Sequence, residues 1–234
     1  MNKLISEAHN LFQNCGFEYC ICGGFALEMF AHKELRSHGD FDISIFEQSK
    51  EEAVIFLQNK GWNVYARFLV LDDASTHNVF YLIENAKDEK WEICVNMWAV
   101  KPDSWVEMVE ESNGSGIYKP RAKKNVPRMQ NLDFIELEIN KRTQNALILP
   151  DSNGITVELD KAILYKNGIP YLAPEIVLFL KSAPFYSTND YQKKKGQIDF
   201  KEIIPLLPKE RCKWLFDAID IAYPQGHGWL DGLL

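Results

Sequence analysis

Two aspartates separated by a single residue carry the clearest chemical signal in the chain. Asp40 and Asp42 lie at the start of an alternating stretch, residues 40–46 (DFDISIF), which predicts a strand with both carboxylates on one face and apolar side chains on the other. Paired carboxylates on one strand face can hold one or two Mg²⁺ ions against a triphosphate. The spacing therefore predicts a magnesium site at this strand.

A pair of glycines upstream suits a phosphate group. Gly23 and Gly24 separate a short apolar strand, predicted at residues 18–22, from a helical pattern that begins at Phe25. The first turn of a helix offers unpaired N–H groups and the positive end of the helix dipole, and both favour an anion. Each feature by itself is also common as an ordinary turn or a solvated acidic pair.

Taken together and in this order, the two features resemble the signature of the nucleotidyltransferase superfamily typified by DNA polymerase beta. Residues 23–30 (GGFALEMF) followed by residues 36–42 (RSHGDFD) are similar to the G-G-W-A-h-D…R-x-H-x-D-h-D pattern of aminoglycoside 2''-adenylyltransferases and lincosamide nucleotidyltransferases. The resemblance continues towards the C-terminus at residues 167–181 (NGIPYLAPEIVLFLK), 195–200 (KGQIDF) and 227–230 (HGWL). Three residues depart from the family pattern, namely Phe25, Gly196 and Gly228.

The resemblance implies a third carboxylate, on a strand antiparallel to the one that carries the aspartates. It would complete the metal site or act as general base. Glu136 in residues 132–139 (LDFIELEI) is the first candidate, because this strand resembles the corresponding family segment. Glu92 in residues 91–95 (WEICV) is the second candidate, and Glu138, on the same strand face as Glu136, is the third.

Three basic residues are candidates for contacts with the nucleotide. The Arg36 guanidinium could neutralise a polyphosphate through two hydrogen bonds, or it could instead pair with Asp40 or Asp42. His38 could contact a phosphate or hold the turn, and Lys195 could reach a phosphate from the helical part of the chain.

The resemblance implies transfer of a nucleoside monophosphate, AMP from ATP or the equivalent from another NTP, to a hydroxyl of a small molecule such as an aminoglycoside or lincosamide. Pyrophosphate would be released, with Mg²⁺ as cofactor. Three alternatives stay open: a non-catalytic nucleotide-binding or regulatory module, a transferase acting on a protein or tRNA, and a phosphohydrolase using the same carboxylates.

The elements that must position these residues predict an α+β protein. We expect a nucleotidyltransferase domain over residues 1–172, with a mixed, twisted sheet flanked by helices, and a helical part over residues 173–234. Residues 101–130 are polar and contain glycines, so they are predicted to form a loop or insertion, with a short helix at 105–110.

Composition narrows the possible partners. The 234 residues carry a formal charge of -7, and only short groups of lysine and arginine occur, which argues against a long nucleic acid as ligand. No apolar run exceeds five residues, so neither a membrane span nor a signal peptide is expected. Five cysteines without metal-site spacing are typical of reduced thiols in the cytoplasm. The sequence does not indicate an oligomeric state.

Overall fold

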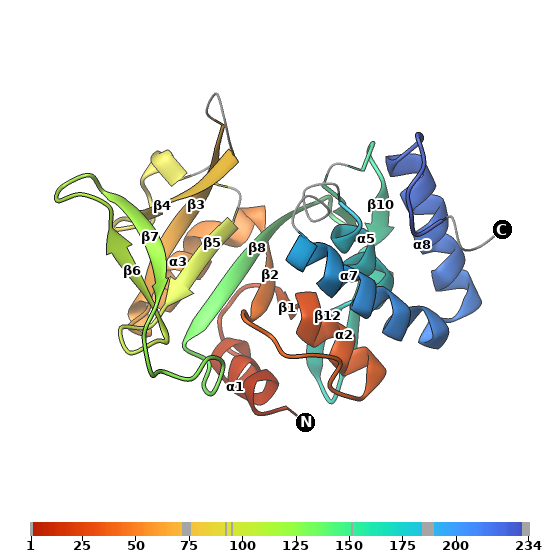
Figure 1. Ribbon diagram of the computed structural model, residues 1–234, viewed down its shortest axis with the longest axis horizontal. Helices are drawn as coiled ribbons and strands as arrows, with labels where there is room; N and C mark the ends of the chain where they lie inside the picture. Colours follow the sequence, from red (N-terminus) through yellow and green to blue (C-terminus); the bar gives the residue numbers. More distant parts are fainter. Residues whose placement is uncertain are drawn as a thin grey trace. The chain divides into compact units, whose positions relative to one another are not determined.

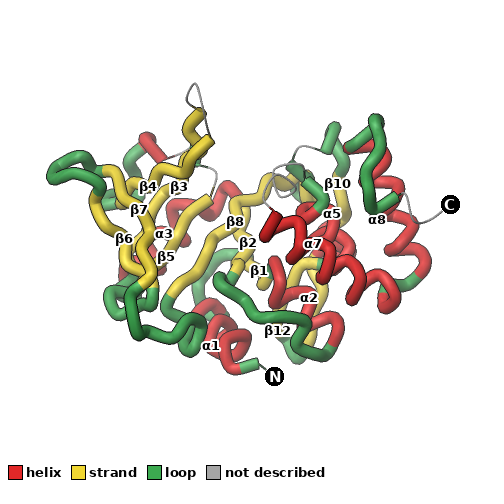
Figure 2. The backbone as a smooth tube through the Cα atoms, in the orientation of Figure 1, coloured by secondary structure: helices red, strands yellow, loops and turns green. Residues whose placement is uncertain are grey.

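The computed structural model describes residues 2–71, 76–91, 93–94, 96–150, 152–183 and 190–230. It confirms the predicted α+β class: strands make up much of residues 63–158, and helices follow residue 173 (Figures 1 and 2). The chain divides into two compact units, each built from two separate segments. The first unit comprises Met1–Tyr19 and His38–Ile139, and the second comprises Cys20–Ser37 and Asn140–Leu234.

A sheet dominates the first unit. Its strands lie in the order β2 (Asp42–Phe46), β8 (Phe134–Arg142), β5 (Asn96–Val100), β3 (Asn63–Leu71), β4 (Thr76–Leu82), β7 (Ile117–Ala122) and β6 (Val106–Glu110). From β8 to β6, each strand is antiparallel to its neighbour. Two helices, α1 (Lys3–Phe12) and α3 (Lys50–Asn59), bury one apolar face each, and two short 3-10 turns occupy Glu47–Ser49 and Glu89–Trp91. Strands β2 and β8 lie where the alternation of apolar side chains predicted them.

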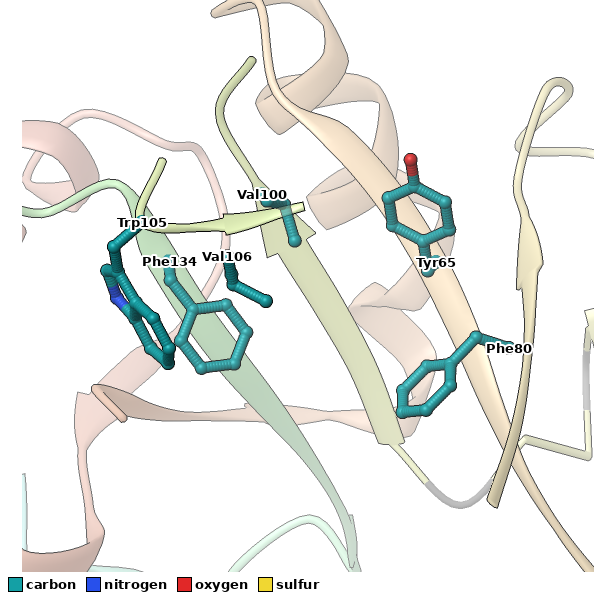
Figure 3. Close-up of a cluster of buried hydrophobic side chains, with 6 residues drawn as sticks. All are labelled: Tyr65, Phe80, Val100, Trp105, Val106 and Phe134. Atoms are coloured by element: carbon teal, nitrogen blue, oxygen red, sulfur yellow. The ribbon is translucent and has the colours of Figure 1, made fainter. Parts of the chain in front are cut away.

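An aromatic cluster fixes the strands of this unit against one another. Figure 3 shows its six buried members on β3, β4, β5, β6, β8 and the β5–β6 connection: Tyr65, Phe80, Val100, Trp105, Val106 and Phe134. The half-buried Trp98 packs between two of them, with its ring centre 4.5 Å from that of Phe80 and 4.9 Å from that of Phe134. Aromatic pairs at these separations add to the free energy gained by burial, so the cluster holds the register of the central strands.

Residues 101–130 correct one expectation. The prediction of a short helix at 105–110 is wrong, because Val106–Glu110 forms strand β6, which pairs with β7 in a hairpin. The predicted loop is thus partly ordered sheet. Val106 and Met108 face the aromatic cluster, whereas Glu107 pairs across the hairpin with Arg121 at 2.8 Å. The many charged residues on the outer face obscured this two-residue period in the sequence.

Short strands in the second unit form two small groups. Strand β12 (Ile169–Leu172) pairs in parallel with β1 (Tyr19–Ile21) and antiparallel with β11 (Ile163–Lys166). Strands β9 (Ala146–Ile148) and β10 (Thr156–Glu158) form an antiparallel pair, and the short helix α4 (Leu159–Ala162) follows.

Helices make up most of the remaining second unit. Helix α2 (Gly23–Ala31) packs on α5 (Pro174–Lys181) and α7 (Asp190–Ile203), and α5 also packs on α8 (Lys209–Ala222). The 3-10 turn Ile204–Leu206 joins α7 to the segment before α8. The sequence pattern predicts helices over residues 197–206 and 209–222. Helix α8 has the second of these bounds, whereas α7 begins at Asp190 rather than Gln197 and ends at Ile203. Helices therefore follow residue 173 as predicted, and α2, from the N-terminal half of the chain, packs with them.

None of the helices in the described ranges is long and apolar enough to cross a membrane.

Candidate functional site

Three carboxylates predicted from the sequence lie together in the first unit. Asp40, Asp42 and Glu136 each offer an oxygen, and these oxygens lie within 4.8 Å of one another. Asp42 is the first residue of β2, and Glu136 lies on β8. The Glu136 amide donates to the carbonyl of Phe41 at 2.9 Å, so the backbone of β8 is bonded to the residue between the two aspartates. This bond places the glutamate beside both aspartates.

The chemistry of this acidic cluster fits a divalent cation. Three carboxylates supply hard oxygen donors, which are the ligands that Mg²⁺ prefers in proteins. Glu136 is buried, and burial, together with the charge of Asp40, raises the pKa of its carboxyl group against the lowering effect of Arg67. A bound cation would relieve both the desolvation and the repulsion between the carboxylates.

Two residues that the sequence did not identify hold Glu136. Arg67 on β3 donates from Nη1 to Glu136 Oε1 at 2.7 Å, and Asn96 on β5 donates from Nδ2 to the same oxygen. They lie 69 and 40 residues from Glu136 in the chain. No local motif marks them, because only the order and register of the strands bring them to Glu136.

The other two candidates for the third carboxylate have different outcomes. Glu138 lies on β8 opposite Asn96, two residues from Glu136. Burial, followed by the charge of Glu136, raises the pKa of Glu138 to about 8. Glu92 lies outside the described residues. Glu138 therefore borders the cluster as a carboxyl group that binds a proton readily.

The raised pKa of Glu138 predicts how stability depends on pH in the metal-free protein. Because the folded state holds this proton more tightly than the unfolded state, the free energy of unfolding should fall as pH rises from about 4.5 to about 8. Glu138→Gln should remove a decline of about 4 kcal/mol across this range, as measured by urea unfolding in the presence of EDTA. An identical pH dependence in both proteins would contradict the assigned shift.

The glycine pair begins a helix in the second unit, as predicted. Strand β1 ends at Ile21, Cys22 is extended, and Gly23 and Gly24 are the first residues of α2. Gly23 has φ +60°, a conformation that strains residues with a side chain. The sequence pattern of strand, glycine turn and helix is thus confirmed as local structure.

Arg36 forms a buried ion pair that sequence reasoning did not predict. Its Nε and Nη2 atoms each lie 2.9 Å from one carboxylate oxygen of Asp199 on α7, and Lys181 Nζ lies 3.1 Å from Oδ2 of the same aspartate. The Asp199 side chain is 1% exposed. Burial alone would raise the pKa of Asp199, but Arg36 and Lys181 together lower it. Asp199 therefore holds two cations in fixed positions within the second unit.

The other two residues predicted to contact the nucleotide, His38 and Lys195, lie in different units. Half-buried His38 begins the second segment of the first unit, two residues before Asp40. Lys195 lies on α7 in the second unit, with Nζ 4.8 Å from the centre of the Tyr191 ring. Their roles in nucleotide binding stay predictions.

Comparison with known proteins supports the resemblance to nucleotidyltransferases that the sequence predicted. Residues 4–112 match the sequence model of the family described as aminoglycoside-2''-adenylyltransferase. This range includes the glycine turn and both aspartates of the cluster. The predicted resemblance is therefore confirmed over the N-terminal part of the chain. None of the curated proteins with which the chain was compared matches it.

Two solved structures are similar to this chain at low sequence identity. The crystal structure of ANT(2'')-Ia in complex with adenylyl-2''-tobramycin matches with a TM-score of 0.51 and 10% identity, covering 94% of this chain and 97% of the other. The lincosamide antibiotic adenylyltransferase LnuA, in a lincomycin-bound crystal structure, has a TM-score of 0.45 and 13% identity, covering 88% of this chain and 98% of its own. The match to ANT(2'')-Ia confirms the predicted nucleotidyltransferase fold.

Proposed function

We propose that the protein is a Mg²⁺-dependent nucleotidyltransferase that moves AMP from ATP to a hydroxyl group of a small molecule and releases pyrophosphate. The observation that carries this proposal is the cluster of Asp40, Asp42 and Glu136, in a chain with the fold of ANT(2'')-Ia. Such a cluster can bind a metal ion that neutralises phosphate oxygens and orients them for an in-line displacement.

Each carboxylate has a role in this proposal. Asp40 and Asp42 would hold the metal from the start of β2, and Glu136 would complete the set from β8. Glu136 also accepts the proton of the acceptor hydroxyl as its oxygen attacks the α-phosphorus. The bond between the α-phosphorus and the bridging oxygen then breaks, and pyrophosphate leaves with the bonding electrons.

The proposed nucleotide contacts follow from their chemistry. The N–H groups at Gly23 and Gly24 would receive phosphate oxygens at the start of α2. Arg36, His38 and Lys195 would add positive charge or hydrogen-bond donors along the polyphosphate.

The acceptor is proposed to be a hydroxylated antibiotic of the aminoglycoside or lincosamide kind. The matched family is described by its 2''-adenylyl transfer to aminoglycosides, which supports this class. The formal charge of -7 also favours a cationic acceptor, since an acidic protein attracts cations at long range. A cytoplasmic location, predicted from the cysteines, would place the enzyme with both ATP and an antibiotic that has entered the cell.

A turnover assay tests the proposal directly. The purified chain is incubated with ATP, Mg²⁺ and a panel of aminoglycosides and lincosamides, and pyrophosphate release and the mass of the acceptor are measured. We expect pyrophosphate release that depends on one acceptor class, which gains the mass of AMP. Orthophosphate without an acceptor would instead indicate a hydrolase, and nucleotide binding without turnover on the panel would favour a binding module or a macromolecular acceptor.

A further inference from the structure

A permanent positive charge lies against the acidic cluster. The Arg67 guanidinium, on a side chain that is 18% exposed, donates to Glu136 Oε1 at 2.7 Å. Its Nε atom donates to Asn78 Oδ1 on β4 at 2.9 Å. Because arginine keeps its proton at every pH that the folded protein tolerates, this charge cannot be removed by deprotonation.

Strand register places Arg67 on the same sheet face as the carboxylates. Arg67 on β3 lies directly opposite Asn96 on β5, and Asn96 lies directly opposite Glu138 on β8. Directly opposite residues share a face of the sheet, so these three side chains form a row across the three strands. Glu136 lies next to the row and receives hydrogen bonds from both Arg67 and Asn96.

This ion pair opposes the binding of a free metal ion in two ways. A cation that binds Glu136 competes with Arg67 for the same carboxylate, and it also approaches a fixed positive charge. A nucleotide changes this balance, because its phosphate oxygens offer the guanidinium new anionic partners in bidentate geometry. The third guanidinium nitrogen, Nη2, makes no hydrogen bond within the described residues, so it can donate to a first phosphate oxygen before the bond from Nη1 to Glu136 breaks.

We propose that Arg67 makes metal binding depend on nucleotide. In the free protein Arg67 pairs with Glu136 and keeps the affinity for Mg²⁺ low. When the nucleotide binds, Arg67 transfers hydrogen bonding from Glu136 to a phosphate oxygen, and Glu136 then joins Asp40 and Asp42 at the metal. This inference rests on the proposed function, because it takes the acidic cluster as the metal site.

The experiment measures metal affinity and does not require turnover. Binding of Mn²⁺, a paramagnetic probe for Mg²⁺ sites, is followed by electron paramagnetic resonance with and without a methylene analogue of ATP that cannot release pyrophosphate. Arg67→Met and Arg67→Gln should bind free Mn²⁺ roughly tenfold or more tighter than the wild type, because both repulsion and competition are lost. The analogue should tighten Mn²⁺ binding more in the wild type than in either variant.

Three further variants test whether loss of the positive charge at Arg67 causes the tighter Mn²⁺ binding. Arg67→Lys keeps the charge and should stay near the wild type, and Arg121→Met removes an arginine that is 67% exposed in the same unit and should change nothing. Glu136→Gln should weaken Mn²⁺ binding in the presence of the analogue. Circular dichroism checks folding, and Arg67→Gln, which retains a hydrogen-bond donor, serves if Arg67→Met does not fold.

The outcomes separate this inference from the proposed function. If the neutral variants bind Mn²⁺ no tighter than the wild type while Glu136→Gln weakens binding, the metal site stands and the role of Arg67 is refuted. If no variant binds Mn²⁺ even with the nucleotide analogue, the proposed metal site fails, and the role of Arg67 fails with it.

Discussion

Replacing Asp40 and Asp42 together by asparagine is expected to reduce pyrophosphate release by about a thousandfold or more, since a metal contributes several kcal/mol to the stabilisation of the transition state. Asparagine has nearly the same shape as aspartate but no charge, so the acidic cluster would retain only the carboxylate of Glu136. The measurement is acceptor-dependent pyrophosphate release at saturating ATP and Mg²⁺.

Stability should not fall in this variant, which separates loss of chemistry from loss of structure. The two aspartates and Glu136 repel one another in the metal-free protein, so removing two charges should leave the melting temperature unchanged or raise it slightly. Asp88→Asn, which removes an exposed partner of Lys90 in the same unit, is the matched control and should retain full activity. Near-normal turnover in the double variant would refute the assigned metal site.

Replacing Asp199 by alanine is expected to destabilise the second unit by about 3–5 kcal/mol, the usual cost of removing one partner of a buried ion pair. The substitution leaves Arg36 and Lys181, with side chains 11% and 17% exposed, without their shared carboxylate. Hydrogen exchange followed by mass spectrometry should show lost protection in α5 and α7, which carry Lys181 and Asp199.

A control on the same helix tests whether burial is the cause. Glu202→Gln breaks an exposed ion pair with Lys33, and it should cost at most about 0.5 kcal/mol. The effect of Asp199→Ala should also depend on pH. Because the folded pKa of Asp199 lies below its ordinary value, its contribution is complete above that ordinary value and is lost as pH falls through the folded pKa. Equal protection of α5 and α7 in wild type and Asp199→Ala would exclude a stabilising role.

Local patterns were sufficient to predict several elements of the fold. Helix α8 has the predicted bounds, and β2 and β8 arose from alternating apolar residues at their predicted places. These predictions succeeded because helix and strand periods are read from neighbouring residues. The hairpin of β6 and β7 was missed because its outer face is charged and its inner face is formed by a few residues that only the sheet defines.

The residues of the candidate site also fall into two groups, those that the sequence predicted and those that only the structure revealed. Asp40 and Asp42 were recognisable in the sequence because they stand two residues apart at the start of one alternating stretch, although β2 itself begins at Asp42. Glu136 was recognisable because its strand resembles a family segment. The sequence offered Asp40 or Asp42 as partners for Arg36, whereas the structure shows a bidentate pair with Asp199, 163 residues away.

The sequence by itself therefore determined the kinds of chemical group in this protein: paired carboxylates at the start of a strand, glycines at the start of a helix, and an acidic α+β chain. Only the tertiary structure decided which side chains meet them, namely Arg67 and Asn96 at Glu136, and Asp199 at Arg36. The physical reason is that strand order and register depend on burial and hydrogen bonding summed over the whole sheet. A short segment fixes which face a side chain occupies, but not its neighbour across the sheet.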